Sequence, residues 1–113
     1  MERRQKISGY KSMWLIVLFD LPVDTKEARR NYRQFRKALL RKGFTQLQLS
    51  VYARFFRSEE RAEPIKVHVR ACIPPDGHVR MFSVTNAQFA KMESYYGQKR
   101  EPVEKKPKQM RLF

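Results

Sequence analysis

One acidic side chain stands where it could serve a chemical site. Asp20 directly follows the apolar run 13–19, and Leu21 and Pro22 come next. A carboxylate at the point where a buried strand leaves the core can face a cleft, and a divalent cation such as magnesium binds one or two carboxylates together with waters and phosphate oxygens. Two copies of Asp20 at a dimer axis would make an ordinary metal site. The alternative, which the sequence alone favours, is a turn residue whose carboxylate accepts a backbone N–H.

A second candidate for chemistry is the basic segment 26–42, where eight Lys and Arg residues stand against one acid, Glu27. Helical spacing puts five of the basic residues on one stripe about 22 Å long. Unpaired cations in such a row match a phosphate backbone, whereas an ordinary solvated helix face mixes Glu with Lys. The predicted nucleic-acid-binding residues are Lys26, Arg29, Arg30, Arg33, Arg36, Lys37 and Arg41.

The overall charge favours the same class of partner. In 113 residues, 25 Lys and Arg stand against 11 Asp and Glu, giving a net charge of +14. Such a surface attracts polyanions, so nucleic acid is the leading partner and an anionic membrane is the weaker alternative. Cys72 is the single cysteine, which excludes an intrachain disulfide and a thiolate-rich zinc site and fits a reducing compartment. The apolar run is far too short to span a membrane, so we expect a cytoplasmic protein.

The elements that position these residues begin with a strand. The continuous apolar run 13–19 is typical of a strand covered on both faces. Asp24 and Glu27 have the spacing of a capping box, which predicts a helix from about Thr25. Gly43 is expected to end that helix. Its predicted buried face consists of Ala28, Tyr32, Phe35 and Leu39.

The second half of the chain repeats this alternation. Residues 44–56 predict either a hairpin without a glycine turn or one long bent strand. A second helix follows Ser58, and Pro64 requires either a kink or a later start near Glu63. After a turn at 74–77 come a strand at 79–85, a short helix capped by Thr85, and a short strand within 93–96.

This order of elements predicts an α+β, ferredoxin-like βαββαβ domain with a four-stranded antiparallel sheet. Both helices lie on one face of such a sheet, so the other face requires a partner, and the abundant apolar residues favour a homodimer packed through the sheets. The predicted organisation is a basic N-terminal extension at 1–12, the domain at 13–97, and a flexible basic tail at 98–113.

Several sequence blocks resemble the CRISPR-associated protein two family, the small subunit of the spacer-acquisition machinery. They are Leu15-Ile-Val-Leu-Phe-Asp-Leu-Pro-Val23, the basic helix, Gly43-Phe44, Gln48-Leu-Ser-Val-Tyr52, Val84-Thr85 and Gln88-Phe89. The match covers roughly residues 13–97. Its specificity lies in the joint order of the blocks, and the first and fourth are similar to members from type II systems.

The resemblance implies a homodimer with Asp20 of both subunits near the two-fold axis, as the catalytic and metal-binding position for Mg²⁺ or Mn²⁺. It also implies a metal-dependent endonuclease activity on RNA or DNA. The better established family role is structural: a bridge between two dimers of the CRISPR integrase that holds duplex DNA. An acidic position of the family is Leu49 here, which weakens the enzymatic interpretation. The remaining alternative is a stand-alone RNA-binding or toxin-like ribonuclease module, with single-stranded RNA as its ligand.

The tail contains one further candidate motif, Gln109-Met-Arg-Leu-Phe113. An extended peptide with apolar anchors behind a polar linker is typical of a docking motif, with Gln109, Met110, Leu112 and Phe113 as the docking residues. We expect it to bind the partner subunit or the integrase. Disorder is one alternative, and the other is binding to the bacterial replication sliding clamp, whose peptide ligands are similar. His68, His78 and Cys72 are interpreted as structural or surface residues.

Overall fold

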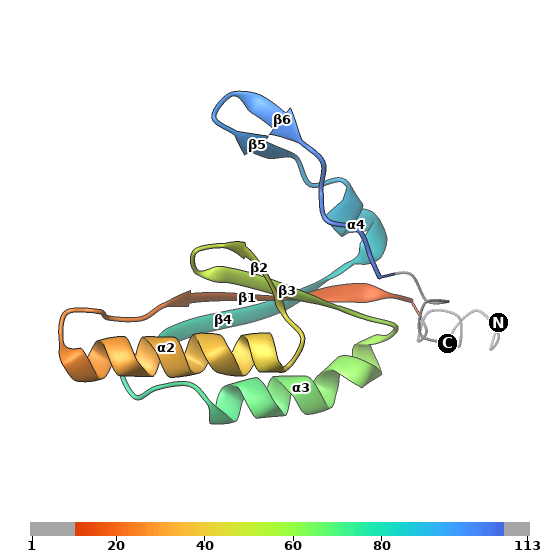
Figure 1. The fold of residues 1–113 in the computed structure, drawn as a ribbon. Helices are drawn as coiled ribbons and strands as arrows, with labels where there is room; N and C mark the ends of the chain where they lie inside the picture. The colour runs from red at the N-terminus through yellow and green to blue at the C-terminus, as the bar shows by residue number, and fades with distance from the viewer. Residues whose placement is uncertain (1–10, 108–113) are drawn as a thin grey trace.

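The computed structural model describes residues 11–107, which form a four-stranded antiparallel sheet with two long helices on one face (Figure 1). The strand order is β2-β3-β1-β4. The central strands are β1 (Met13–Asp20) and β3 (Val51–Phe56), and the edge strands are β2 (Thr45–Gln48) and β4 (His78–Thr85). The predicted α+β, ferredoxin-like class is confirmed.

From Trp14 to Val17, both faces of β1 are covered, as the apolar run predicted. Leu15, Val17 and Phe19 point toward the helices and belong to the main core. Trp14 and Ile16 point to the other face and are 4% and 6% exposed. The side chains of a strand alternate between its two faces, so a run without polar residues is required at such a position.

Helix α2 (Lys26–Arg41) begins one residue later than predicted. Thr25, in an extended conformation, accepts a hydrogen bond from the Ala28 N–H at 3.0 Å, so Thr25 caps the helix and the capping box assigned to Asp24 is wrong. The predicted end is confirmed, because Gly43 has a φ of +85°, a conformation that favours glycine. Arg54 of β3 donates to the Lys42 carbonyl at 2.6 Å and closes the helix end.

The segment after α2 is a hairpin, so the alternative of one bent strand is wrong. β2 and β3 pair antiparallel, with an irregularity between Gln46 and Gln48, and Leu49 and Ser50 make the turn without a glycine. Helix α3 (Glu59–Ala71) begins after Ser58, whose side chain accepts from the Arg61 N–H. The later start near Glu63 is therefore wrong, and Pro64 lies inside the helix.

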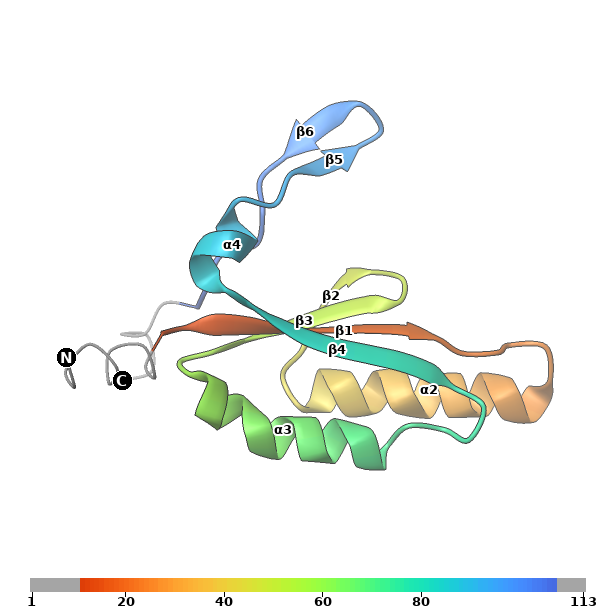
Figure 2. The ribbon, with the colours of Figure 1, turned by 180° about the vertical axis from the view of Figure 1, so that it is seen from behind.

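The sheet continues into an arm. Thr85 and Gln88 form the predicted capping box of α4 (Asn86–Ala90). The predicted strand β5 (Ser94–Tyr96) pairs with β6 (Lys99–Glu101), which lies in the segment predicted to be a tail. This hairpin projects from the sheet on the side opposite α2 and α3 (Figures 1 and 2). Among the described helices, none combines the length and apolar character needed to cross a membrane.

Candidate functional site: a basic helix and an acidic strand end

Helix α2 presents its basic side chains to solvent because its apolar residues are used in the core. Phe35 and Leu39 are each 1% exposed and pack below the sheet, so the stripe on the other side of the helix faces outward. The side chains of all five residues of this stripe are exposed and make no hydrogen bond or ion pair with other residues of the described range. They are Lys26, Arg30, Arg33, Lys37 and Arg41.

The other two predicted nucleic-acid-binding residues differ from the stripe because each is bonded within the chain. Arg29 is exposed and donates to the Val23 carbonyl at 3.0 Å, which ties the helix start to the preceding loop. Arg36 is half-buried and donates to the Gln46 side chain on β2 at 3.5 Å. These bonds leave the five-residue stripe as the part of the helix with uncompensated charge.

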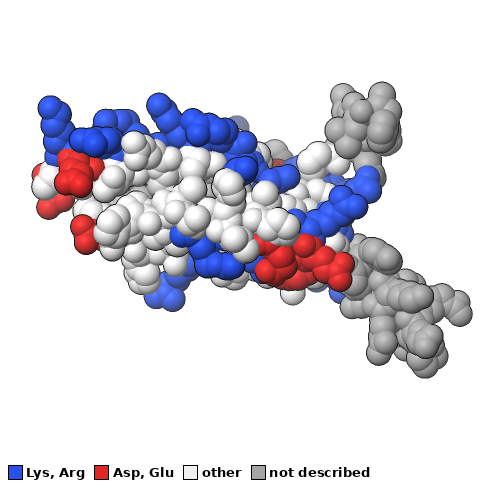
Figure 3. Space-filling view, turned by 90° about the horizontal axis from the view of Figure 1, so that it is seen from below, with Lys and Arg blue, Asp and Glu red and all other residues white. Residues whose placement is uncertain are grey.

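Acidic side chains are few beside the stripe, where Glu27 is the one acid of α2. On the helical side of the molecule, many Lys and Arg lie along one long edge, and Asp and Glu gather mainly at one end of this edge and in a second group away from it (Figure 3). On α3, Lys66 bonds to both Glu59 and Glu63, at 3.2 and 3.1 Å. Burial lowers the pKa of Lys66, but its bonds to the two carboxylates outweigh this effect and raise the pKa above its ordinary value. Cation pairing therefore occurs on α3, whereas the α2 stripe is unpaired.

Asp20 lies at the end of β1 and is exposed. By the alternation of β1 it shares a face with Trp14, Ile16 and Leu18, so its carboxylate is on the side of the sheet away from α2 and α3. No group in residues 11–107 donates a hydrogen bond to this carboxylate. The prediction of a turn residue that accepts a backbone N–H is therefore wrong, and the carboxylate is free to bind a ligand.

The structure places His78 directly opposite Asp20. The two residues are partners in the antiparallel register of β1 and β4, so they share one face. Both side chains are exposed. No local pattern in the chain predicts this pairing, because the register of two strands separated by nearly 60 residues is set only when the sheet forms.

The donors at this end of the sheet fit a cation held mainly by water. Within the described range, no three His, Cys, Asp or Glu side chains gather in a way that could hold a metal ion. One accessible carboxylate is nevertheless the donor that Mg²⁺ or Mn²⁺ takes when it retains several waters. The Asp20 carboxylate would hold such an ion together with water molecules.

The face that carries Asp20 is otherwise apolar and only partly covered. Helix α4 covers one end of it, where Trp14 stacks on Phe89 with ring centroids 4.1 Å apart. Phe82, directly opposite Ile16, remains 47% exposed. Further partly buried side chains on this face are Leu18, Leu47, Val51, Phe55 and Val84. An apolar sheet face of this kind favours a protein partner.

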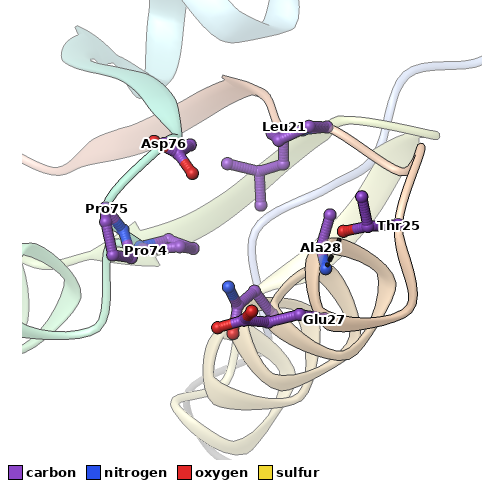
Figure 4. Close-up of a pocket in the computed structure, with 9 residues that line it drawn as sticks. Leu21, Thr25, Glu27, Ala28, Pro74, Pro75 and Asp76 are labelled. Atoms are coloured by element: carbon purple, nitrogen blue, oxygen red, sulfur yellow. Dashed lines mark hydrogen bonds between the residues drawn. The ribbon is translucent and has the colours of Figure 1, made fainter.

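A cavity of about 110 Å³ lies on the opposite side of this end of β1 (Figure 4). Its walls come from the loop after β1, the first turns of α2 and the loop before β4, with Leu21, Glu27 and Asp76 among the lining residues. Leu21 belongs to the main core, so this cavity is on the helix side of the sheet. Asp76 therefore does not join Asp20 in one donor set.

The other residues singled out in the sequence lie away from Asp20 and the α2 stripe or outside the described range. Cys72 is half-buried and packs against the main core, which confirms a structural role, and His68 is exposed on α3. The predicted docking residues Gln109, Met110, Leu112 and Phe113 lie outside the described residues.

Comparison with known proteins identifies the family. The model of CRISPR associated protein Cas2 matches residues 13–92. A CRISPR-associated endoribonuclease Cas2 of Parvibaculum lavamentivorans is 47% identical over 104 residues, which cover 89% of this chain and 100% of the relative. Proteins of the same name from Flavobacterium psychrophilum and Paracidovorax avenae are 38% and 40% identical, and cover 99% and 95% of this chain and 97% and 99% of their own lengths. With matches that extend over the sheet, both long helices and most of the arm, the chain belongs to the CRISPR associated protein Cas2 family.

Proposed function

We propose that this protein is the small subunit of a CRISPR spacer-acquisition complex, where it binds duplex DNA and bridges dimers of the integrase. The observation that carries the proposal is the row of five exposed, unpaired cations on α2 in a chain of the Cas2 family. The row spans about 22 Å, which corresponds to more than half a turn of B-form DNA. Contacts of this kind bind phosphates without reading bases, as a protein that captures fragments of arbitrary sequence requires.

The proposed assembly is a homodimer packed through the sheet face opposite α2 and α3. Phe82 and its apolar neighbours are covered when a second copy lies on this face. Both basic helices then lie on the outer surfaces of the dimer, where a duplex can reach them. The arm of α4, β5 and β6 also extends on the dimer side (Figure 2), and an isolated two-stranded hairpin is marginally stable without a partner.

A second candidate function is endonucleolytic cleavage, because the relatives are named endoribonucleases. Asp20 is the proposed residue for this activity, and Mg²⁺ or Mn²⁺ the proposed cofactor. A bound divalent cation would neutralise phosphate charge and lower the pKa of an attacking water. The contribution of the chain is to hold that cation through the free Asp20 carboxylate, at the edge of a face that a second copy would shield from solvent. The substrate of the reaction would be RNA or DNA.

One experiment separates the structural and the enzymatic functions. The purified chain is combined with its integrase, and duplex binding, spacer integration and metal-dependent cleavage are measured for the wild type, Asp20→Asn, and the double variant Arg33→Glu/Lys37→Glu. We expect Asp20→Asn to lose cleavage and to retain duplex binding and integration. The double variant should lose binding and integration together. Full integration by the double variant would contradict the proposed bridging function, and cleavage by Asp20→Asn would contradict the role of Asp20.

A further inference from the structure

His78 lies beside Asp20 and has a side chain that can also bind a metal ion. The two residues are paired across β1 and β4, and side chains at such positions have Cβ atoms about 4.5–5.5 Å apart. An imidazole nitrogen and a carboxylate oxygen at that separation can converge on one cation at bond lengths of about 2.0–2.2 Å. Both side chains are exposed, and neither is hydrogen-bonded to another residue of the described range.

Among residues 11–107, no third His, Cys, Asp or Glu side chain joins these two in a group that could hold a metal ion. Asp76 lines the cavity on the helix side. Arg80 shares the face of Asp20 and His78, two residues farther along β4, where it lies opposite Leu18. Its charge weakens the binding of a free cation and favours a phosphate held beside that cation. The pair therefore binds a free cation weakly, and a phosphate-bearing ligand would strengthen this binding.

We propose that His78 is the second protein ligand of a divalent-cation site that begins with Asp20, and that this nitrogen–oxygen pair makes the site prefer a first-row transition-metal ion, such as Mn²⁺, over Mg²⁺. Mg²⁺ binds oxygen donors and retains its waters. First-row transition-metal ions bind imidazole nitrogen more readily, and Mn²⁺ has the lowest affinity among them, so a preference for Mn²⁺ over Mg²⁺ is the smallest selectivity that this donor pair would produce. The use of such an ion in cleavage rests on the proposed function. The binding of the ion is independent of that function, because it depends only on Asp20 and His78.

The test uses the full chain and inorganic Mn²⁺ and Mg²⁺. The chain contains only two histidines, so His68 on α3 provides a matched control. Mn²⁺ binding is measured by the loss of the free-ion electron paramagnetic resonance signal for the wild type, His78→Gln, His68→Gln and Asp20→Asn. We expect His78→Gln to weaken Mn²⁺ binding by roughly tenfold or more and to leave Mg²⁺ binding, followed by competition, nearly unchanged. His68→Gln should bind Mn²⁺ as the wild type does.

A second measurement needs no variant. In the nuclear magnetic resonance spectrum of the wild type, substoichiometric Mn²⁺ should broaden the imidazole signals of His78 before those of His68. Equal Mn²⁺ affinity for His78→Gln and the wild type would overturn the proposal, and so would equal broadening of the two histidines. Neither result would change duplex binding or integration. Failure of the metal-site proposal is therefore distinguishable from failure of the proposed function. Loss of integration in the α2 double variant, in turn, says nothing about His78.

Discussion

The Trp14 indole N–H donates to the Asn86 side-chain carbonyl at 2.9 Å, across the junction between the sheet and the arm. The same indole stacks on Phe89, with 11° between the ring planes, and meets the edge of Phe55. One β1 side chain thus fixes both the first residue and the buried face of α4. The direction of the β5–β6 hairpin follows from this anchor, because α4 is the only described element between the hairpin and β4.

We expect removal of this anchor to free the arm and to leave the main core folded. Phe89→Ala should cost about 3 kcal/mol, because Phe89 is 4% exposed. Asn86→Ala should cost about 1 kcal/mol through the lost hydrogen bond. Hydrogen exchange at residues 94–101 measures the arm, and Lys91→Ala, at an exposed position, is the control. Unchanged protection of the hairpin in Phe89→Ala would contradict this role of Trp14 and Phe89.

The homodimer proposal predicts that Phe82→Glu produces a monomer. Phe82 is 47% exposed in the single chain, so its substitution should not disrupt the core. In a symmetric dimer the charge appears twice at the interface, and the loss of affinity should be roughly a hundredfold or more. Sedimentation at micromolar concentration measures the change. The control is Val67→Glu, at a residue of α3 that is 55% exposed. A wild-type protein that sediments as a well-folded monomer would exclude the dimer.

The parts of the fold that follow from local pattern were predictable. The apolar run identified a central strand, the spacing of Phe35 and Leu39 identified the buried face of α2, and Thr85 with Gln88 identified the short helix. In each case neighbouring residues in the chain carry the information. The wrong cap at Asp24 has the same origin, because two adjacent residues, Asp24 and Thr25, can both accept the first N–H of a helix.

The parts that depend on pairing between distant segments were not predictable. β6 is polar and forms only against β5. His78 faces Asp20 through the β1–β4 register, and the sequence offered no reason to join them. Arg36 looked like the other basic residues of α2, but the strand β2 supplies Gln46 as a partner. For the candidate site, residue types were visible in the sequence, whereas their juxtaposition was set by the sheet.

The α2 stripe should give duplex binding a steep salt dependence. If a dimer neutralises six to ten phosphates, affinity falls by about a thousandfold or more between 50 and 200 mM salt. In Arg33→Glu/Lys37→Glu the slope of log affinity against log salt should become shallower. The control is Arg61→Glu/Arg70→Glu, which makes the same change of charge at exposed positions of α3. Equal slopes for the α2 variant and the wild type would exclude α2 as the interface.

Deletion of residues 109–113 should weaken binding to the integrase and leave duplex binding unchanged. This prediction rests on the sequence, in which Leu112 and Phe113 follow a charged, proline-bearing segment. The double variant Leu112→Ser/Phe113→Ser retains the length and the charge of the segment and should behave as the deletion does. Affinity for the integrase and for the replication sliding clamp is measured separately. Loss of clamp binding alone would identify the clamp as the partner, and unchanged affinity for both would contradict a docking role.

Tyr52 offers a test of the core itself. Its ring is fully buried, and its hydroxyl has no hydrogen-bond partner among residues 11–107. Burial raises the pKa of Tyr52 above its ordinary value, although the nearby Arg36 guanidinium opposes this effect. Since an unpaired buried hydroxyl costs free energy of folding, Tyr52→Phe should leave stability unchanged or raise it by about 1 kcal/mol.

The same substitution has a pH signature. The phenol has a higher pKa in the folded protein than in the unfolded chain, so its contribution to stability is complete below about pH 10 and is lost as the pH rises through the folded pKa. Tyr52→Phe should remove this part of the loss of stability at alkaline pH, and Tyr96→Phe, at a residue of the arm that is 79% exposed, provides the control. Urea unfolding at pH 8 and at pH 10.5 measures both effects. A Tyr52→Phe protein that is less stable at pH 8 would show that the hydroxyl is paired, and it would contradict the prediction.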